Sequence, residues 1–531
     1  MDLEINLEIT SEKFFETLEI NFNHNYVADF YWSKTMTDYI YDVKLGWFGY
    51  NLHNKLIRYG KDAPIYMLND ITGKFKAELN IKFSKLNTND KNFLGNCKTY
   101  KRTMNKIGDT RFCESVIGRL KSLYNKENFY KLIDNNNLLI PFEDCVYDLK
   151  TSLFRDIKKT DYISITTGYY IKYEISKLGY TISDEKYINK YGGIINDKLD
   201  IKYIDDFLSS IFDDDLKNYM VDILSHNLIH NNFEKLWIWC GSGGNGKGVL
   251  ASLLSSSLGD LYYKADSQFL TTKYKGQTAN STLYNCQNKR FVMVSEPEIS
   301  EGQKELKFNV EFLKGITGRD ELTCRALKEN NITFKPTFNL ICQTNEKPTI
   351  SGIDNAIKRR LVIIPFKYTF VETPIYQFHR KIDTTLKDKF NSEKYIVSFI
   401  FYLINNLEKL YNENGRDIER LIKSNIKMPE DIKDEIENYL DENDIISKYL
   451  NEEIIKTNNK DDYILKTDLY KEFINYTITN NNDKISKDKF YNYLKSNNII
   501  EVRKEKKGKT MRIFEGIKLK SDDEEENDKF I

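Results

Sequence analysis

The segment from Gly241 to Lys247 constrains the fold of this chain more than any other. It reads Gly241-Ser242-Gly243-Gly244-Asn245-Gly246-Lys247. It follows an apolar run, Leu236–Cys240, and opens a stretch with apolar residues at helical spacing: Val249, Leu250, Leu253 and Leu254. A glycine-rich loop between a strand and a helix can turn its N–H groups toward phosphate oxygens, and the helix dipole and Lys247 add positive charge. We therefore expect an ATP site, with a glycine-rich turn and a surface lysine as the alternative.

Gly248 belongs to this expected site but departs from the usual pattern. A Ser or Thr usually follows the lysine of such a loop, and its hydroxyl binds Mg²⁺. With glycine at this position, Mg²⁺ would rely on carboxylates, phosphate oxygens and water. The sequence therefore predicts ATP binding and leaves the rate of hydrolysis in question.

Polar side chains follow two further apolar runs. Glu296 and then Glu298 come after Phe291–Val294. A carboxylate at the tip of a strand can bind Mg²⁺ and orient the attacking water, and Glu296 is the preferred candidate. Asn345 comes after Phe338–Cys342 and could hydrogen-bond the γ-phosphate or the water. The alternatives are surface acids and an ordinary turn asparagine.

Arg359 and Arg360 precede a fourth apolar run, Leu361–Ile364. They could reach the ATP of a neighbouring subunit as an arginine finger, or they could form a solvated charge pair. Short apolar strands that alternate with helical segments predict a largely parallel sheet covered on both faces. The expected fold class is α/β, with this sheet as an ATPase core of the P-loop type.

The 531 residues are too many for one hydrophobic core, so we expect several domains. The expected divisions are an N-terminal region without a motif at 1–95, a largely helical region at 96–230, the ATPase core at 231–372, a helical connector at 373–458, a domain with winged-helix pattern at 459–520 and an acidic tail at 521–531. Within the second region, apolar spacing predicts one helix from Ile204 to Ile229. In the fifth, helices are expected at 466–477 and 487–497, followed by a β-hairpin with strands at 499–503 and 511–514.

Composition limits the partners. Lys and Arg total 79, as do Asp and Glu, so nucleic-acid binding would need local basic patches. The seven cysteines form no CxxC pair, which argues against a zinc ribbon or a disulfide framework and fits a reducing compartment. The most apolar stretch, Ile396–Ile404, is too short to span a bilayer, and no signal peptide is visible. We expect a soluble, intracellular protein without a membrane partner.

The order and spacing of the motifs resemble those of superfamily III helicases within the AAA+ class, above all the helicase portion of viral and phage primase–helicases, including the poxvirus type. Lys247 and Glu296 are 49 residues apart, Glu296 and Asn345 another 49, and Asn345 and Arg360 15. The resemblance rests on residues 241–247, 295–298, 316–320, 334–336, 343–345, 359–360 and 364–366. It covers about residues 200–515, more weakly 140–170, and leaves out 1–95.

The resemblance implies a homo-hexameric ring that hydrolyses ATP between subunits, with Mg²⁺, and draws single-stranded or forked DNA through its centre during the DNA replication of a virus or mobile element. It implies a separate primase or polymerase as a possible partner, and the host cytoplasm or a viral replication site as the location. It also implies that residues Leu322–Phe334 form a hairpin in the central channel, where Arg325 and Lys328 could contact phosphates.

Basic residues crowd the expected C-terminal hairpin: Arg503, Lys504, Lys506, Lys507, Lys509 and Arg512. Such a wing suits contacts to DNA phosphates, and a solvated face is the alternative. For the whole chain, the alternative to a helicase is a replication initiator or scaffold that binds ATP and DNA but hardly hydrolyses, which Gly248 would favour. A packaging ATPase is disfavoured by the compact spacing of the motifs.

Overall fold

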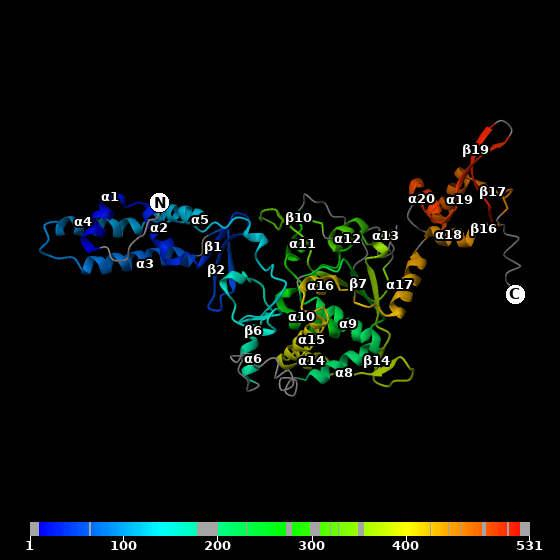
Figure 1. Cartoon of the computed structure of the whole chain (residues 1–531), viewed down its shortest axis with the longest axis horizontal. Helices are drawn as coiled ribbons and strands as arrows, with labels where there is room; N and C mark the ends of the chain where they lie inside the picture. The colour runs from blue at the N-terminus through cyan, green and yellow to red at the C-terminus, as the bar shows by residue number, and fades with distance from the viewer. Residues whose placement is uncertain are drawn as a thin grey trace.

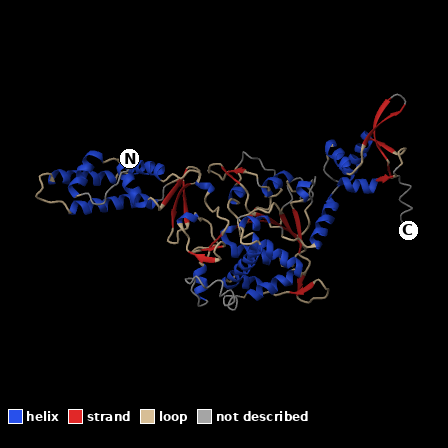
Figure 2. Ribbon diagram, in the orientation of Figure 1, coloured by secondary structure: helices blue, strands red, loops and turns tan. Residues whose placement is uncertain are grey.

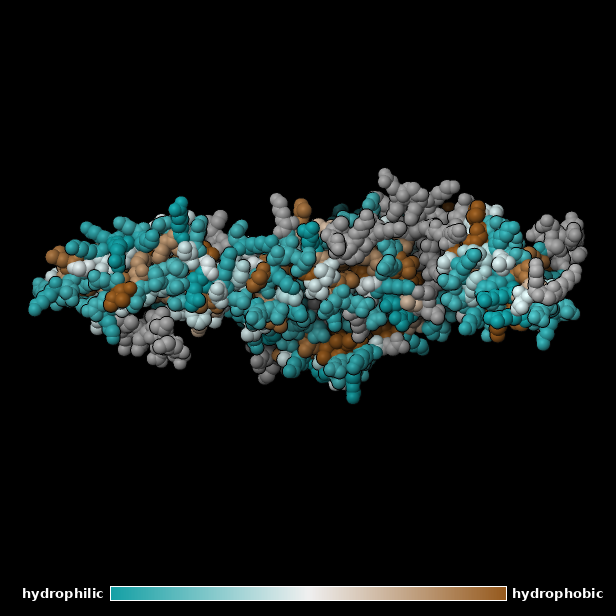
Figure 3. All heavy atoms as spheres, turned by 90° about the horizontal axis from the view of Figure 1, so that it is seen from above, coloured by the Kyte–Doolittle hydropathy of each residue, from teal (hydrophilic) through white to brown (hydrophobic). Residues whose placement is uncertain are grey.

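The computed structural model describes residues 10–62, 65–177, 200–229, 231–271, 279–297, 308–318, 320–327, 329–348, 355–424, 426–443, 445–457, 459–480, 485–506 and 509–520. The molecule is elongated, with a helical N-terminal part, a central α/β part and a small C-terminal part in a row (Figure 1, Figure 2). No helix in these ranges is long and apolar enough to cross a membrane. Viewed from above, the surface is mainly hydrophilic, with some apolar side chains gathered in the middle of the molecule (Figure 3).

A five-stranded parallel sheet forms the centre of the molecule. In spatial order its strands are β13 (Leu361–Pro365), β7 (Leu236–Cys240), β12 (Asn339–Thr344), β9 (Phe291–Ser295) and β8 (Tyr262–Ala265). The first four residues of β7, β9 and β13 are buried, as expected for strands covered on both faces. The predicted α/β class and four of the strands are therefore confirmed, whereas β8 was not predicted.

Two hydrophobic clusters cover the two faces of this sheet. Trp237 and Trp239 of β7 pack with helices α8 (Ile201–Ile211), α9 (Asp214–His226), α10 (Lys247–Leu258) and α15 (Glu393–Glu413). Leu236 and Ile238 face the other way, toward α12 (Val310–Thr317) and α17 (Glu430–Asn443). Alternate residues of one strand thus serve opposite layers, which fixes the loop after β7 at one edge of a rigid sheet.

The single helix expected from Ile204 to Ile229 is wrong. Phe212 is extended, with φ −130° and ψ 151°, and separates α8 from α9. The Asp213 carboxylate caps α9 by accepting a hydrogen bond from the backbone N–H of Leu216 at 3.2 Å. An aspartate at an N-cap, followed by two more acids in the first turn, starts a new helix more readily than it continues the old one.

The N-terminal part combines a helical cluster with a small sheet. Its helices are α1 (Ser11–Asn21), α2 (His24–Thr35), α3 (Ile65–Ser84), α4 (Phe93–Ile107) and α5 (Thr110–Leu123), and the antiparallel strands β1 (Tyr39–Asp42), β2 (Gly46–Tyr50) and β3 (Leu56–Gly60) form its sheet. One hydrophobic cluster runs from Phe14 to Tyr124. The packing of this part therefore crosses residue 95, where a division was expected.

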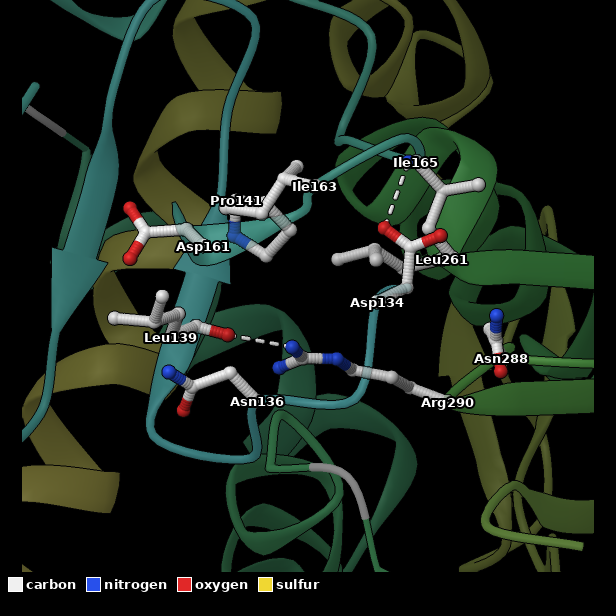
Figure 4. A pocket seen from close by; sticks show the side chains of 10 residues that line it. All are labelled: Asp134, Asn136, Leu139, Pro141, Asp161, Ile163, Ile165, Leu261, Asn288 and Arg290. Atoms are coloured by element: carbon white, nitrogen blue, oxygen red, sulfur yellow. Dashed lines mark hydrogen bonds between the residues drawn. The ribbon is translucent and has the colours of Figure 1, made fainter. Parts of the chain in front are cut away.

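A short segment joins this part to the central sheet. It contains the antiparallel strands β4 (Leu139–Pro141), β5 (Val146–Asp148) and β6 (Leu153–Arg155), then α6 (Ile171–Lys177). The buried Arg290 guanidinium reaches into this segment from the start of β9 and donates to the carbonyl of Leu139, while Asp134 nearby accepts hydrogen bonds from the backbone N–H groups of Ser164 and Ile165 (Figure 4). Buried polar groups of this kind tie the segment to the sheet.

The region after β13 is not simply a connector. It holds the parallel pair β14 (Thr369–Val371) and β15 (His379–Lys381), then α14 (Leu386–Phe390), α15 and α16 (Ile418–Lys423). α15 belongs to the core, because Phe399, Ile400 and Leu403 are fully buried in it. Short elements elsewhere are α11 (Ser281–Asn285), α13 (Asn355–Lys358), β10 (Leu322–Cys324), β11 (Ile332–Phe334) and three 3₁₀ turns, at Phe129–Lys131, Lys159–Asp161 and Gly259–Leu261.

The C-terminal part has the predicted order of two helices and a β-hairpin. It comprises α18 (Ile445–Glu453), β16 (Ile454–Lys456), β17 (Tyr463–Leu465), α19 (Lys466–Thr479), α20 (Lys487–Ser496), β18 (Glu501–Lys506), β19 (Lys509–Glu515) and β20 (Ile517–Leu519). It has its own hydrophobic cluster, with Phe473 and Phe490 at the centre. The predicted acidic tail lies outside the described residues.

Candidate nucleotide site and nucleic-acid surfaces

The glycine-rich loop lies at the carboxyl edge of the sheet. Gly244 and Gly246 have φ values of 74° and 86°, which glycine adopts without strain. A Cβ atom on Gly246 would lie 2.6 Å from the side chain of Ile211 in α8. Phe370 of β14 donates its backbone N–H to the carbonyl of Gly244 at 2.8 Å. The loop is therefore held between the end of α8 and β14, and α10 begins directly after it.

Lys247 folds back over this loop. Its ammonium group donates to the carbonyls of Gly241 and Ser242, and to the side-chain oxygens of Asn245 at 3.2 Å and Asn345 at 3.4 Å. These four oxygens are neutral, and the residue is only 3% exposed. Burial lowers the pKa of Lys247, and the nearby Glu296 acts in the opposite direction. A buried cation with neutral partners is well suited to receive an anion such as phosphate.

Two asparagines complete the surroundings of Lys247. Asn345 follows β12, the strand next to β7, so its amide reaches the loop from the neighbouring strand end. The side-chain nitrogen of Asn245 is buried and has no hydrogen-bond partner among the described residues. Because an unsatisfied buried donor costs free energy, this nitrogen is a fitting contact for a ligand oxygen.

Glu296 follows β9, the other neighbour of β12. Its backbone has φ 46°, an uncommon value for a residue with a side chain, and its N–H donates to the carbonyl of Gln343 at 2.7 Å. The side chain is exposed at the same edge of the sheet as Lys247. Glu298 lies outside the described residues.

These residues suit Mg²⁺ carried by a nucleotide. No group of three metal-ligating side chains occurs in the part of the chain that the structure describes. Mg²⁺ commonly keeps several waters and takes one or two carboxylates together with substrate phosphates. Glu296 could be that carboxylate, with the remaining ligands from phosphate and water.

An apolar pocket that the sequence did not reveal adjoins the loop. Its volume is about 350 Å³, and its lining includes Gly244 and Gly246 together with the apolar side chains of Phe207, Val249, Phe370, Ile382 and Leu386. These side chains come from α8, α10 and the region after β13, and only the fold brings them together. Such an apolar pocket beside the glycine-rich loop can take a flat, weakly polar group.

The two arginines lie at the opposite edge of the sheet. They precede β13, whose first residue pairs with the first residue of β7, so the strand length of roughly 16 Å separates them from the glycine loop. Arg360 is buried and donates to the carbonyl of Ala356 at 2.7 Å, whereas Arg359 is exposed. Of the two, only Arg359 is placed to contact another molecule.

β10 and β11 form the hairpin expected between Leu322 and Phe334. Thr323 and Thr333 pair across it, with their hydroxyl oxygens 3.0 Å apart. Arg325 is exposed near the end of β10, and its backbone carbonyl accepts from the N–H of Asn280 at 2.9 Å. Lys328 lies outside the described residues.

The tip of this hairpin contacts the N-terminal sheet. Asn330 donates to the backbone carbonyls of Val43 and Lys44 at 3.3 and 3.2 Å. The Arg58 guanidinium on β3 forms an ion pair with Glu329 at 3.1 Å and donates to the Tyr284 hydroxyl at 3.2 Å. These contacts could not be predicted from the sequence, because they join segments far apart in the chain.

The basic wing is a regular antiparallel ladder. Arg503 stands opposite Arg512, both exposed, and Lys506 stands opposite Lys509. Lys504 lies over the Tyr463 ring at 4.8 Å, and Arg512 pairs with Glu501 at 3.5 Å. Lys507 lies outside the described residues, as do the side chains of Lys506 and Lys509.

Comparisons with known proteins identify two families along the chain. The family described as "D5 N terminal like" matches residues 27–213, and a family of unknown function, DUF5906, matches residues 239–360, which include the loop, Glu296 and Asn345. The first match begins within the N-terminal part. The likeness therefore reaches further toward the N-terminus than the motifs indicated.

Among related proteins, "Putative helicase L207/L206" of Acanthamoeba polyphaga mimivirus is 33% identical over 51% of this chain and 26% of its own length. "Putative helicase 121R" of Invertebrate iridescent virus 3 is 28% identical over 59% of this chain and 32% of its own. "Primase D5" of Fowlpox virus is 26% identical over 52% of this chain and 34% of its own length. This chain thus spans about a quarter to a third of the length of these relatives. The resemblance to viral primase–helicases of the poxvirus type is confirmed.

A solved structure, the apo C-terminal region of NrS-1, covers 59% of this chain and 75% of its own, with 16% identity and a TM-score of 0.36.

Proposed function

Because this chain is a homologue of viral proteins named as helicases and as primase D5, we propose that it is an ATP-hydrolysing DNA helicase that acts in viral DNA replication. The observation that supports this most is the meeting of three strand ends. The loop after β7, Glu296 after β9 and Asn345 after β12 converge at one edge of the sheet, around Lys247.

Each of these groups has a role in the proposed hydrolysis. The loop N–H groups and Lys247 bind the phosphates, and the ammonium exchanges its four neutral oxygen partners for anionic ones. Asn345 orients the γ-phosphate or the attacking water. Glu296 would hold Mg²⁺ and position that water, and Mg²⁺ would supply positive charge next to the phosphates. The adenine base of ATP would lie in the apolar pocket beside Phe370.

The assembly we propose is a homo-hexameric ring. The exposed Arg359 cannot reach the loop of its own subunit, since the two lie at opposite edges of the sheet. In a ring it would reach the ATP of the neighbour and stabilise the transition state there. Arg360, buried against Ala356, would support the position of its neighbour instead.

The proposed nucleic-acid contacts lie in two different parts of the molecule. The β10–β11 hairpin, with Arg325 and Lys328, would contact a single strand in the ring, and the wing would contact duplex or forked DNA. We propose a separate primase or polymerase as a possible further partner, since one relative is named "Primase D5".

Turnover measured with and without a single-stranded oligonucleotide tests the proposal. We expect ATP hydrolysis that the oligonucleotide stimulates, and its loss in Lys247→Ala and in Glu296→Gln, with Glu296→Gln still binding ATP. Lys264→Ala changes an exposed lysine on β8 and serves as the control. Near-wild-type turnover in a folded Lys247→Ala protein would overturn the assignment. Loss of turnover in Glu298→Gln but not in Glu296→Gln would show that Glu298, and not Glu296, is the carboxylate that hydrolysis needs.

One feature favours a second function, that of an initiator or scaffold that binds ATP without efficient hydrolysis. Gly248 supplies no hydroxyl to Mg²⁺ at the start of α10. ATP binding without oligonucleotide-stimulated turnover in the wild-type protein would support this function over the helicase.

A further inference from the structure

A cavity of about 320 Å³ lies between the N-terminal sheet and the central part of the molecule. Its apolar lining includes Leu45 and Phe48 from the N-terminal part and Ile133 from the joining segment. Its polar lining includes two tyrosines, two cations and neighbouring amides: Tyr263, Tyr284, Arg58, Lys289, Asn285 and Gln287. A space of this size can hold one nucleobase with its sugar.

The two tyrosines are held in place by their hydroxyl groups. Tyr284 accepts from Arg58 at 3.2 Å, and Tyr263 accepts from the side-chain amide of Asn285 at 3.4 Å. Both rings are half-buried, so part of each remains accessible. Fixed aromatic rings beside cations and amides are what proteins use to bind unpaired bases, since every base has a face that stacks.

The cavity is connected to the hairpin through Arg58. This guanidinium lines the cavity and pairs with Glu329 at the hairpin tip, with about a third of its side chain exposed. A phosphate can replace the carboxylate of Glu329, because guanidinium binds both anions in the same bidentate geometry. Directly after β10, the backbone carbonyl of Arg325 accepts a hydrogen bond from the N–H of Asn280, which immediately precedes α11, the helix that carries Tyr284. A single strand of DNA that contacts the hairpin would therefore lie close to the cavity.

The lining also contains one acid, Asp134, which could oppose an anionic ligand. Its carboxylate is occupied, because it accepts hydrogen bonds from the backbone N–H groups of Ser164 at 2.6 Å and Ile165 at 3.2 Å, and from the Ser164 hydroxyl. Arg58 and Lys289 outnumber it in the lining. The charge of the cavity therefore suits a phosphate near its rim.

We propose that this cavity binds one base of the single strand that contacts the hairpin, with Tyr263 and Tyr284 against the base and Arg58 and Lys289 near the adjoining phosphate. This inference rests on the proposed binding of single-stranded DNA and assigns that activity a site beyond the hairpin and the wing. When a phosphate binds Arg58, the ion pair with Glu329 is replaced, so strand binding and release of the hairpin tip are coupled.

Photo-crosslinking locates the base directly. The full chain is bound to a thymidine oligonucleotide that contains one 5-iodouracil, irradiated and digested, and the labelled residues are identified. We expect labelling of Tyr263 or Tyr284 that unlabelled oligonucleotide suppresses. Labelling confined to the hairpin or the wing would overturn the proposal. Equally strong labelling by free 5-iodo-dUMP would show a site for mononucleotides, which would overturn it too.

Affinity for the same oligonucleotide separates stacking from packing. Tyr284→Leu combined with Tyr263→Leu should raise the Kd by about 5- to 150-fold, the usual effect of losing base stacking. The double Phe variant keeps both rings but loses the hydrogen bonds to Arg58 and Asn285, so it should lose less affinity than the double Leu variant. Tyr376→Leu, at an exposed tyrosine outside the cavity, is the control. Equal affinity of the Leu and wild-type proteins would overturn the inference, whereas a wild type that binds no single strand would overturn the proposed function itself.

Discussion

Lys247 illustrates how a single residue prepares the site for its ligand. Its ammonium group donates to four oxygens of the loop and of Asn345, and burial lowers the pKa of Lys247. A phosphate must displace these oxygens, and it replaces neutral partners by charged ones. An ammonium and a phosphate attract each other as opposite charges, and burial strengthens that attraction, so the exchange favours binding.

Gly248 offers a direct test of the metal site. A Cβ atom at this position would meet no atom within 4 Å, so a larger residue fits without strain. Gly248→Ser should place a hydroxyl beside the phosphates and lower the Mg²⁺ concentration for half-maximal ATP hydrolysis, by up to about tenfold. Steady-state turnover over a series of Mg²⁺ concentrations measures this effect.

Gly248→Ala is the matched control. It stabilises the first turn of α10 as much as serine does or more, by about 0.5–1 kcal/mol, but it adds no hydroxyl. The same Mg²⁺ dependence in the Ser and Ala variants would show that position 248 does not face the metal.

At the scale of elements, His226 joins α9 to α16. Its ring is fully buried, and its Nε2 lies 2.7 Å from the carbonyl of Leu421. Burial lowers the pKa of His226 below its usual 6.5. The unfolded chain therefore binds a proton more readily than the folded one below pH 6.5, and stability falls as the pH drops from there toward the lowered pKa.

We expect the melting temperature of the wild type to fall more steeply below pH 6.5 than that of His226→Gln. The slope that this residue contributes is at most about 1.4 kcal/mol of unfolding free energy per pH unit. Thermal unfolding at pH 7.5, 6.5 and 5.5 compares the two proteins. His53→Gln, at an exposed histidine, should keep the wild-type slope. Parallel curves for all three would contradict the prediction.

The wing is a second element with a measurable contribution. Neutralising Lys506, Lys507 and Lys509 to Gln should weaken DNA binding and flatten its dependence on salt. Each lost contact changes the log–log slope by about 0.9 on duplex or 0.7 on single strands. Filter binding between 50 and 200 mM salt would measure both slopes.

The control for the wing changes charge equally but elsewhere. Lys409, Lys423 and Lys433 are exposed on α15, α16 and α17, and their triple Gln variant has the same net charge. It should keep the wild-type slope. If both triple variants lose the same DNA affinity and the same salt slope, the overall charge of the protein and not the wing governs binding.

Elements with a local signal were predictable from the sequence, and those set by tertiary contacts were not. β7, β9 and β13 are almost entirely apolar, and β12 has the apolar run Leu340–Cys342 at its centre. β8 contains the exposed Lys264 and has no comparable apolar run, so its sequence does not predict a buried strand. Helical spacing continues across Phe212, so only the cap at Asp213 shows where α8 ends. The glycine-rich loop, Glu296 and Asn345 were predictable as site residues, because each directly follows an apolar run in the sequence. The apolar pocket did not, because Phe207 and Phe370 meet only in the fold.

At the scale of the whole molecule, the proposed ring can be tested by mixing subunits. An Arg359→Ala protein and a Lys247→Ala protein should each be inactive alone. In mixed rings, some interfaces would combine an intact loop on one side with an intact Arg359 on the other, so part of the turnover should return. Arg360→Ala, at the buried arginine that supports Arg359, should lower turnover less than Arg359→Ala does. Absence of rescue in verified mixed assemblies would argue against a role of Arg359 between subunits.

The hairpin tip and the N-terminal sheet are linked by a few polar contacts. Arg58 and Glu329 are 271 residues apart in the sequence, yet with Asn330 they form a short bridge of one ion pair and two hydrogen bonds. Such bonds hold only within a few tenths of an ångström of their length. A movement of the hairpin along its own axis must therefore either break these contacts or move the N-terminal sheet with it. In the proposed helicase, movement of the hairpin would therefore be transmitted to β1–β3 for as long as the bridge holds.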